Sequence, residues 1–291
     1  MNDIYRIDKA RMRASFDRAA VSYDAAAVLQ KEVRERMLNR LDFVKIAPQT
    51  ILDAGCGTGR ATLALSSRFN KSRVIALDIA MGMLRKTQAA QPWMKRMLGL
   101  SRQELVCGDI ENLPLSSQSV DLIWSNLAMQ WCNDLDQAFQ ESHRVLNSGG
   151  LIMFSTFGPD TLKELREAAK ADPDHVHVSR FIDMHDIGDA LVRAGFSAPV
   201  LDVERFTLTY DDVIGVMRDL KAIGAHNAAE GRRRGLEGKG FLRKLTESYE
   251  QFRHDGKLPA TFEVVYGHAW KPEPKIQAAD GSVPITLHRK K

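Results

Sequence analysis

A glycine-rich turn between a short apolar run and a helical pattern constrains the fold of this chain more than any other feature. Residues 50–59 read Thr-Ile-Leu-Asp-Ala-Gly-Cys-Gly-Thr-Gly, and an apolar helical pattern follows from Ala61 to Phe69. This order predicts a buried strand, a tight turn and a helix start, the unit that holds a nucleotide-like ligand in a doubly wound α/β sheet. Glycine lets the backbone of the turn adopt positive φ and lets a ligand approach it closely.

The spacing of these glycines differs from that of dinucleotide-binding sites. Such sites usually read G-x-G-x-x-G, whereas here the third glycine, Gly59, comes one residue early and Arg60 stands in its usual place. Asp53, just before the turn, would repel a pyrophosphate. The turn therefore favours a ligand without phosphates that carries an ammonium group.

Polar residues also end the next predicted strands. Val74–Asp78 ends in an acid about 20 residues after the glycines, where a carboxylate can accept both hydroxyls of a ribose. Glu104–Cys107 leads into Asp109, which can accept from an adenine amino group, and Val120–Trp124 leads into Asn126. A single acid at a strand end can merely be solvated or cap a helix, but three acids at successive strand ends, Asp53, Asp78 and Asp109, favour a nucleoside ligand.

This set of motifs resembles the class I S-adenosylmethionine-dependent methyltransferases. Leu52–Gly59 is similar to their first motif, Asp78 and Asp109 match their ribose and adenine acids, and Arg144–Leu151 resembles a later motif. The resemblance covers roughly residues 49–157 and implies S-adenosylmethionine as the methyl donor. The cofactor contacts expected on this basis are Gln30, Asp53, Gly55, Gly57, Gly59, Asp78, Ile79, Met83, Asp109, Ile110 and Asn126.

The order of elements predicts an α/β fold of the Rossmann-like class I methyltransferase type. Strands alternate with helices up to Phe157, which implies a mostly parallel, seven-stranded sheet with right-handed crossovers and helices on both faces. The expected divisions are an N-terminal helical lid at 1–48, the cofactor-binding core at 49–210, a basic helical insertion at 211–258, the last core strand at 259–271 and a loosely ordered tail at 272–291.

Composition excludes several classes of protein. Hydrophobic residues make up 44% of the chain, enough for a sizeable core. No apolar run approaches the ~20 residues of a membrane helix, and acids stand where a signal peptide would have its apolar core. The three cysteines are widely spaced and form no metal motif. We therefore expect a cytoplasmic protein that uses no metal and binds no membrane.

Segments outside the cofactor core resemble one family, the malonyl-acyl carrier protein O-methyltransferases of biotin synthesis. The matching segments are Phe16–Tyr23, Leu29–Gln30, Ser125–Cys132, Thr156–Leu165, Arg180–Phe181, Met217–His226 and Pro259–Tyr266. The match covers nearly the whole chain except its last 20 residues. It implies methyl transfer to the free carboxylate of a malonyl thioester on acyl carrier protein, an early step of pimeloyl, and hence biotin, synthesis.

The implied reaction needs alignment and no general base, because a carboxylate is already ionised at neutral pH. Our candidates to orient the substrate are Tyr23, Asn126, Trp131 and Arg180. Structural alternatives stay open at this point. Arg180 could form an ion pair, Tyr23 could pack the lid, and Gln30 could be a surface residue of a helix.

A positively charged segment is the candidate docking surface for the acidic carrier protein. Residues 218–257 hold ten Lys and Arg against six Asp and Glu. This excess of four positive charges equals the net charge of +4 of the whole chain. The expected docking residues are Arg232, Arg233, Arg234, Lys239, Arg243 and Lys244. A merely solvated helical face is the alternative interpretation.

Three other functions compete with this one. A methyltransferase for a small free carboxylic acid would need one arginine and no charged face. A methyltransferase-like assembly factor related to the complex I assembly proteins would carry a transit peptide, for which the N-terminus gives no sign. Nucleic-acid methylation lacks a basic segment interleaved with aromatic residues, so we expect no nucleic-acid partner.

Overall fold

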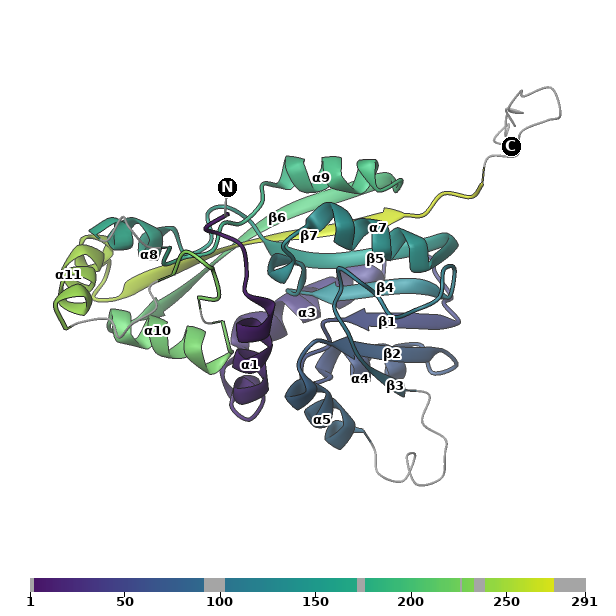
Figure 1. Ribbon diagram of the computed structural model, residues 1–291, viewed down its shortest axis with the longest axis horizontal. Helices are drawn as coiled ribbons and strands as arrows, with labels where there is room; N and C mark the ends of the chain where they lie inside the picture. The colour runs from purple at the N-terminus through teal and green to yellow at the C-terminus, as the bar shows by residue number, and fades with distance from the viewer. Residues whose placement is uncertain (1–2, 92–102, 172–175, 226, 233–238, 275–291) are drawn as a thin grey trace.

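One sheet of seven strands organises the molecule (Figure 1). The computed structural model describes residues 3–91, 103–171, 176–225, 227–232 and 239–274. The strand order is β3-β2-β1-β4-β5-β7-β6, and β7 is antiparallel to both of its neighbours. The strands are β1 Thr50–Ala54, β2 Arg73–Asp78, β3 Gln103–Cys107, β4 Val120–Asn126, β5 Leu146–Phe157, β6 Ser197–Tyr210 and β7 Leu258–Trp270. The predicted fold class is therefore confirmed.

Helices cover both faces of the sheet because strand residues alternate between them. Ile51 of β1 packs in the cluster that includes α3 and α4, and the next residue, Leu52, packs in the cluster that includes α7 and α9. The described α-helices are α1 Lys9–Ala19, α2 Tyr23–Ala26, α3 Val28–Leu41, α4 Arg60–Arg68, α5 Met81–Ala90, α7 Leu135–Val145, α8 Lys163–Ala168, α9 Met184–Arg193, α10 Val213–Ala222 and α11 Lys239–Tyr249.

Two of the segments that resemble the known families contain element boundaries. β5 begins at Leu146 and runs through Gly149 and Gly150. The N-terminal helical segment is broken after Phe16, because α1 ends at Ala19 and Tyr23 opens the short α2. The hydroxyl of Ser22, at this break, donates to the carbonyl of Ala222 in α10 at 3.0 Å.

The hairpin of β6 and β7 extends beyond the rest of the sheet. β7 pairs with β5 only from Val264 to Trp270, whereas its pairing with β6 continues to Leu258. In Figure 1 the projecting end of the hairpin lies beside α8, α10 and α11. The expected tail lies largely outside the described residues, as do Arg233 and Arg234.

A buried carboxyl group attaches α8 to this hairpin, and its removal should destabilise the fold. Glu164 is 5% exposed and accepts hydrogen bonds from the backbone N–H and the hydroxyl of Thr261. We expect Glu164→Ala to lower the free energy of unfolding by about 1–3 kcal/mol, because it leaves a buried N–H without an acceptor. Urea denaturation measures this loss. Glu167→Ala, in the same helix, is the control, since that carboxylate forms an exposed pair with Lys170; equal losses would contradict the prediction.

Candidate active site

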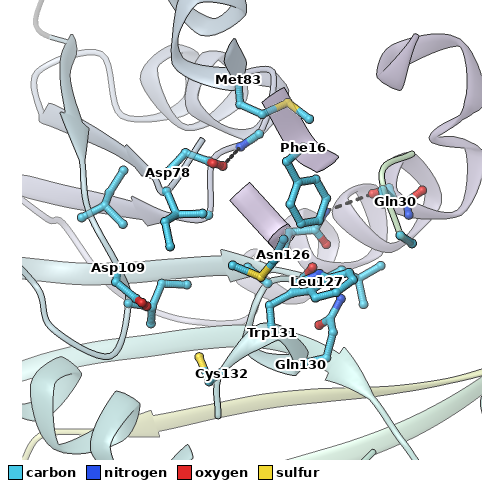
Figure 2. A pocket seen from close by; sticks show the side chains of 18 of the residues that line it. Phe16, Gln30, Asp78, Met83, Asp109, Asn126, Leu127, Gln130, Trp131 and Cys132 are labelled. Atoms are coloured by element: carbon cyan, nitrogen blue, oxygen red, sulfur yellow. Dashed lines mark hydrogen bonds between the residues drawn. The ribbon is translucent and has the colours of Figure 1, made fainter. Parts of the chain in front are cut away.

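A cavity opens at the carboxyl ends of the parallel strands, where the strand order reverses between β1 and β4 (Figure 2). Ligands of open α/β sheets bind at such a switch point. We call it the central cavity. Its walls combine strand ends, the glycine turn and the N-terminal helices, and they include Tyr23, Gly57, Asp78, Asp109, Asn126 and Trp131.

The three turn glycines have different roles, although all have positive φ. A Cβ at Gly55 would lie 2.3 Å from the Cβ of Ala128, and one at Gly59 would lie 2.6 Å from the side chain of Thr87. A Cβ at Gly57 would meet nothing within 4 Å, because this residue borders the central cavity. Gly55 and Gly59 are thus required by packing, whereas Gly57 leaves room for a ligand.

Two backbone N–H groups fix the carboxylate of Asp78 in the wall of the central cavity. One oxygen accepts from the backbone N–H of Gly57 at 2.9 Å, and the other accepts from that of Ala80 at 2.8 Å. Burial raises the pKa of Asp78 to about 6. Each oxygen keeps a second lone pair, so the carboxylate can still accept ribose hydroxyls. Its role in cofactor binding stays a prediction.

Asp53 borders a second cavity, which we call the adjoining cavity. The two cavities share Gly55, Gly57 and Asn126, among others. Asp53 is buried and accepts from the hydroxyl of Thr62 at 2.5 Å, and burial raises its pKa to about 7. A buried carboxyl group with a raised pKa is well suited to meet an ammonium group.

Arg34 lies in the wall of the same adjoining cavity, and sequence reasoning missed it. Its side chain is 17% exposed. The only sequence signal is its position one helical turn after Gln30, which puts both residues on one face of α3. An acid and a guanidinium in one cavity can receive the ammonium and the carboxylate of an amino acid, respectively.

Asp109 also reaches the central cavity but already has a cationic partner. The ammonium group of Lys9 donates to it at 3.0 Å and pairs with Glu111 as well. Nothing in the local sequence around Asp109 indicates this contact from α1. The expected apolar contacts Ile79, Met83 and Ile110 line the same cavity. Their roles toward a ligand stay predictions.

The candidates for orienting the substrate divide into two groups. Tyr23, Asn126 and Trp131 line the central cavity, and the ring of Trp131 meets Phe16 edge to face at 5.1 Å. Burial, with the nearby Asp78, raises the pKa of Tyr23, so its hydroxyl stays a hydrogen-bond donor. Arg180 is exposed and borders a separate cavity, so the structure does not bring it together with the others.

The amide of Asn126 is fixed between the sheet and α3. Its Nδ2 donates to the carbonyl of Gln30 at 3.1 Å, and its Oδ1 accepts from the hydroxyl of Ser155 at 3.1 Å. Gln30 itself borders both cavities. Its expected contact with the cofactor stays a prediction.

Carboxylates of the N-terminal helices attach them to the core around the cavities. Asp24 accepts from the hydroxyl of Thr58 at 2.5 Å and from the guanidinium of Arg60 at 2.6 Å. Asp17 accepts from the backbone N–H of Gly82, at the start of α5, at 2.6 Å. Arg60, the residue in the place of a dinucleotide-site glycine, therefore attaches α2 to the start of α4.

The fold and the two cavities define a class I methyltransferase. A family model described as a methyltransferase domain matches residues 52–154. The YcgJ protein from Bacillus subtilis (TM-score 0.56, 17% identity) and a putative methyltransferase from Bacillus halodurans (TM-score 0.58, 18% identity) share the fold. The alignments cover 82% of this chain in both cases, and 98% and 99% of those chains, respectively.

Relatives that match this chain over nearly its whole length identify the family within this class. A malonyl-[acyl-carrier protein] O-methyltransferase from Methylovorus sp. is 69% identical over 97% of this chain and 96% of its own length. One from Gallionella capsiferriformans is 56% identical over 98% of both chains. The chain belongs to the malonyl-[acyl-carrier protein] O-methyltransferase family.

None of the helices in the described part of the chain is long and apolar enough to span a membrane. No group of three or more His, Cys, Asp or Glu side chains in that part of the chain could hold a metal ion.

Proposed function

We propose that this protein methylates the free carboxylate of a malonyl thioester carried by acyl carrier protein, using S-adenosylmethionine, as an early step of biotin synthesis in the cytoplasm. The observation that carries the proposal is 69% identity, over nearly the full length of both chains, to a relative with that name. The two contiguous cavities support it, because their polar groups match the parts of the donor.

The residues present fit S-adenosylmethionine. In our proposal Asp78 accepts the ribose hydroxyls, and the apolar side chains Ile79, Met83 and Ile110 flank the adenine in the central cavity. Asp53 and Arg34 receive the ammonium and the carboxylate in the adjoining cavity. When bound, the donor supplies an electrophilic methyl group on a sulfonium.

The protein itself must then align the acceptor carboxylate with the donor's methyl group and exclude water. The acceptor carboxylate is ionised without help, and among the described residues that line the central cavity none is a histidine. The protonated hydroxyl of Tyr23 and the fixed amide of Asn126 are placed to orient an incoming carboxylate. The edge-to-face pair of Phe16 and Trp131 closes the apolar side of the cavity.

Because the protein only aligns the substrates, kcat and the KM for S-adenosylmethionine should depend differently on pH. We expect kcat at saturating S-adenosylmethionine to stay flat between about pH 6 and 8, because the nucleophile is already ionised there. The KM for S-adenosylmethionine should rise as pH falls toward 6. Asp53 and Asp78 accept best when ionised, and their pKa values in the empty site are about 7 and about 6.

Initial rates across this pH range, at constant ionic strength, check both expectations. A single group titrating near neutrality in kcat would contradict the proposal, since it would indicate a nucleophile that needs deprotonation, such as an amine or a hydroxyl.

Transfer of a labelled methyl group tests the substrate assignment directly. Malonyl carrier protein, malonyl-CoA and free malonate should be compared at equal concentration. We expect the carrier-protein substrate to have the highest kcat/KM. Preference for free malonate would indicate a small-acid methyltransferase, and no transfer to any of the three would favour a non-catalytic assembly factor.

A further inference from the structure

Two further cavities extend from the central cavity to the surface. The first, which we call the inner chamber, shares Gln130, Trp131, Phe157, Ile223 and Ala225 with the central cavity. The second, the mouth cavity, lies among α1, α10 and α11 and shares His177, Leu220, Ala225 and Asn227 with the inner chamber. Shared wall residues make the three cavities a contiguous series.

The inner chamber is apolar with a few hydrogen-bonding groups. Its walls include Phe157, Leu162, Phe181 and Phe262. At its border with the central cavity stands Gln130, next to Trp131 in Figure 2, and the buried Oε1 of Gln130 accepts no hydrogen bond from the described residues. An amide N–H arriving in the chamber would satisfy this oxygen.

The mouth cavity is positively charged. Arg11 of α1 and Lys221 of α10 border it, both side chains are exposed, and neither pairs with a carboxylate within the described part of the chain. No acidic side chain of that part lines the mouth cavity. Two exposed cations at one opening suit a phosphate group.

A second opening from the inner chamber is less favourable for an anion. The side cavity, which contains Arg180, shares His177, Val178, Ser179 and Phe181 with the chamber. Three cations line it, Arg166, Lys170 and Arg180. Arg166 donates to the carbonyls of Pro159 and Thr161, and Lys170 pairs with Glu167 at 2.6 Å, which leaves Arg180. Its walls also include the acids Asp183 and Asp186, which would repel an acidic partner.

We infer that the phosphopantetheine arm of malonyl carrier protein enters through the mouth cavity and crosses the inner chamber to the central cavity. The arm consists of a phosphate, two amides joined by short chains and the thioester. Arg11 and Lys221 hold the phosphate, the inner chamber surrounds the amides, and the malonyl group reaches the donor. This route rests on the proposed function and assigns the docking side of that site.

The proposed docking surface overlaps only in part with the one expected from the sequence. Arg232 also borders the mouth cavity, but its side chain is 15% exposed, donates to the carbonyl of Ala229 and lies near Asp8, so it mainly braces the insertion. Arg243 is exposed beside Glu247. Lys244 comes one turn after Phe241, a wall residue of the mouth cavity, and extends the positive surface there. The remaining expected side chains, Arg233, Arg234 and Lys239, lie outside the described residues.

Charge reversal at the mouth tests the route. Arg11→Glu/Lys221→Glu should raise the KM for malonyl carrier protein at least roughly tenfold, with a larger effect at low salt. Turnover of a short malonyl thioester without a phosphate should not change. The matched control is Arg13→Glu/Arg218→Glu, which makes the same charge change on exposed residues of the same two helices that border none of these cavities.

A second variant tests the chamber itself. Leu220 borders the inner chamber and the mouth cavity but not the central cavity, so Leu220→Trp should obstruct the arm. We expect kcat/KM for malonyl carrier protein to fall at least roughly tenfold, with the affinity for S-adenosylmethionine and the turnover of the short thioester retained. Retained donor affinity shows that the variant is folded.

The outcomes separate the route from the function. If the unaltered protein does not methylate malonyl carrier protein, the proposed function fails and the route fails with it. If it does, and both variants match it across a salt series, only the route is overturned. A raised KM in Lys170→Glu/Arg180→Glu, with none in Arg11→Glu/Lys221→Glu, would place the entrance at the side cavity.

Discussion

Replacement of Asp78 by alanine is expected to lower the affinity for S-adenosylmethionine by about 100-fold or more. The variant loses the acceptor for the ribose hydroxyls and the hydrogen bond that positions the N–H of Gly57. Two hydrogen bonds to a charged group, at about 1.5–3 kcal/mol each, account for a loss of this size. Titration calorimetry on the purified variant measures it.

The fold should survive this change. Burial raises the pKa of Asp78 to about 6. For a group with a raised folded-state pKa, the stabilising contribution is present below the unfolded pKa and is lost as pH rises through about 6. At neutral pH the ionised carboxylate therefore does not stabilise the empty protein through its charge. Asp78→Asn, which keeps the shape and one acceptor, is the control and should bind with intermediate affinity. Unchanged donor affinity in a folded Asp78→Ala protein would contradict the assigned role.

Replacement of Gly57 by valine should also abolish detectable cofactor binding, through shape instead of charge. A Cβ at this position points into open space within the protein, and that space is the proposed ligand site. Because φ is +56°, the substitution adds strain of about 1–2 kcal/mol. The variant should therefore fold with reduced stability, and we expect donor affinity to fall by about 100-fold or more.

The neighbouring glycine gives a matched comparison. Gly55→Val also places a side chain on a backbone with positive φ, but its Cβ would lie 2.3 Å from the Cβ of Ala128. We expect a much larger loss of thermal stability there than at Gly57. If both variants lost stability equally and Gly57→Val still bound the donor, the turn would have only a structural role.

Local sequence patterns were sufficient for the parts of the fold that depend on local order. The run that ends at Asp53 predicts strand, turn and helix because short-range sterics decide the conformation there. The acids Asp78 and Asp109 could be placed at one edge of the sheet because parallel strands end on the same side. Both side chains reach the central cavity.

Contacts between distant segments could not be predicted in this way. The pairing of Lys9 with Asp109 joins residues from α1 and the end of β3. The place of Arg34 in the adjoining cavity depends on how α3 packs on the sheet. For the same reason Arg180, which follows no strand end, could not be assigned to a cavity from the sequence. A long-range contact leaves no mark in the spacing of neighbouring residues.

Helix α1 serves both substrates in the proposed arrangement. Through Asp17 it is hydrogen-bonded to the start of α5, beside the donor site, and through Arg11 it borders the opening for the carrier arm. Because one helix lies at both places, we expect a carrier protein engaged at Arg11 to hold α1 against α5 and so to slow release of the donor.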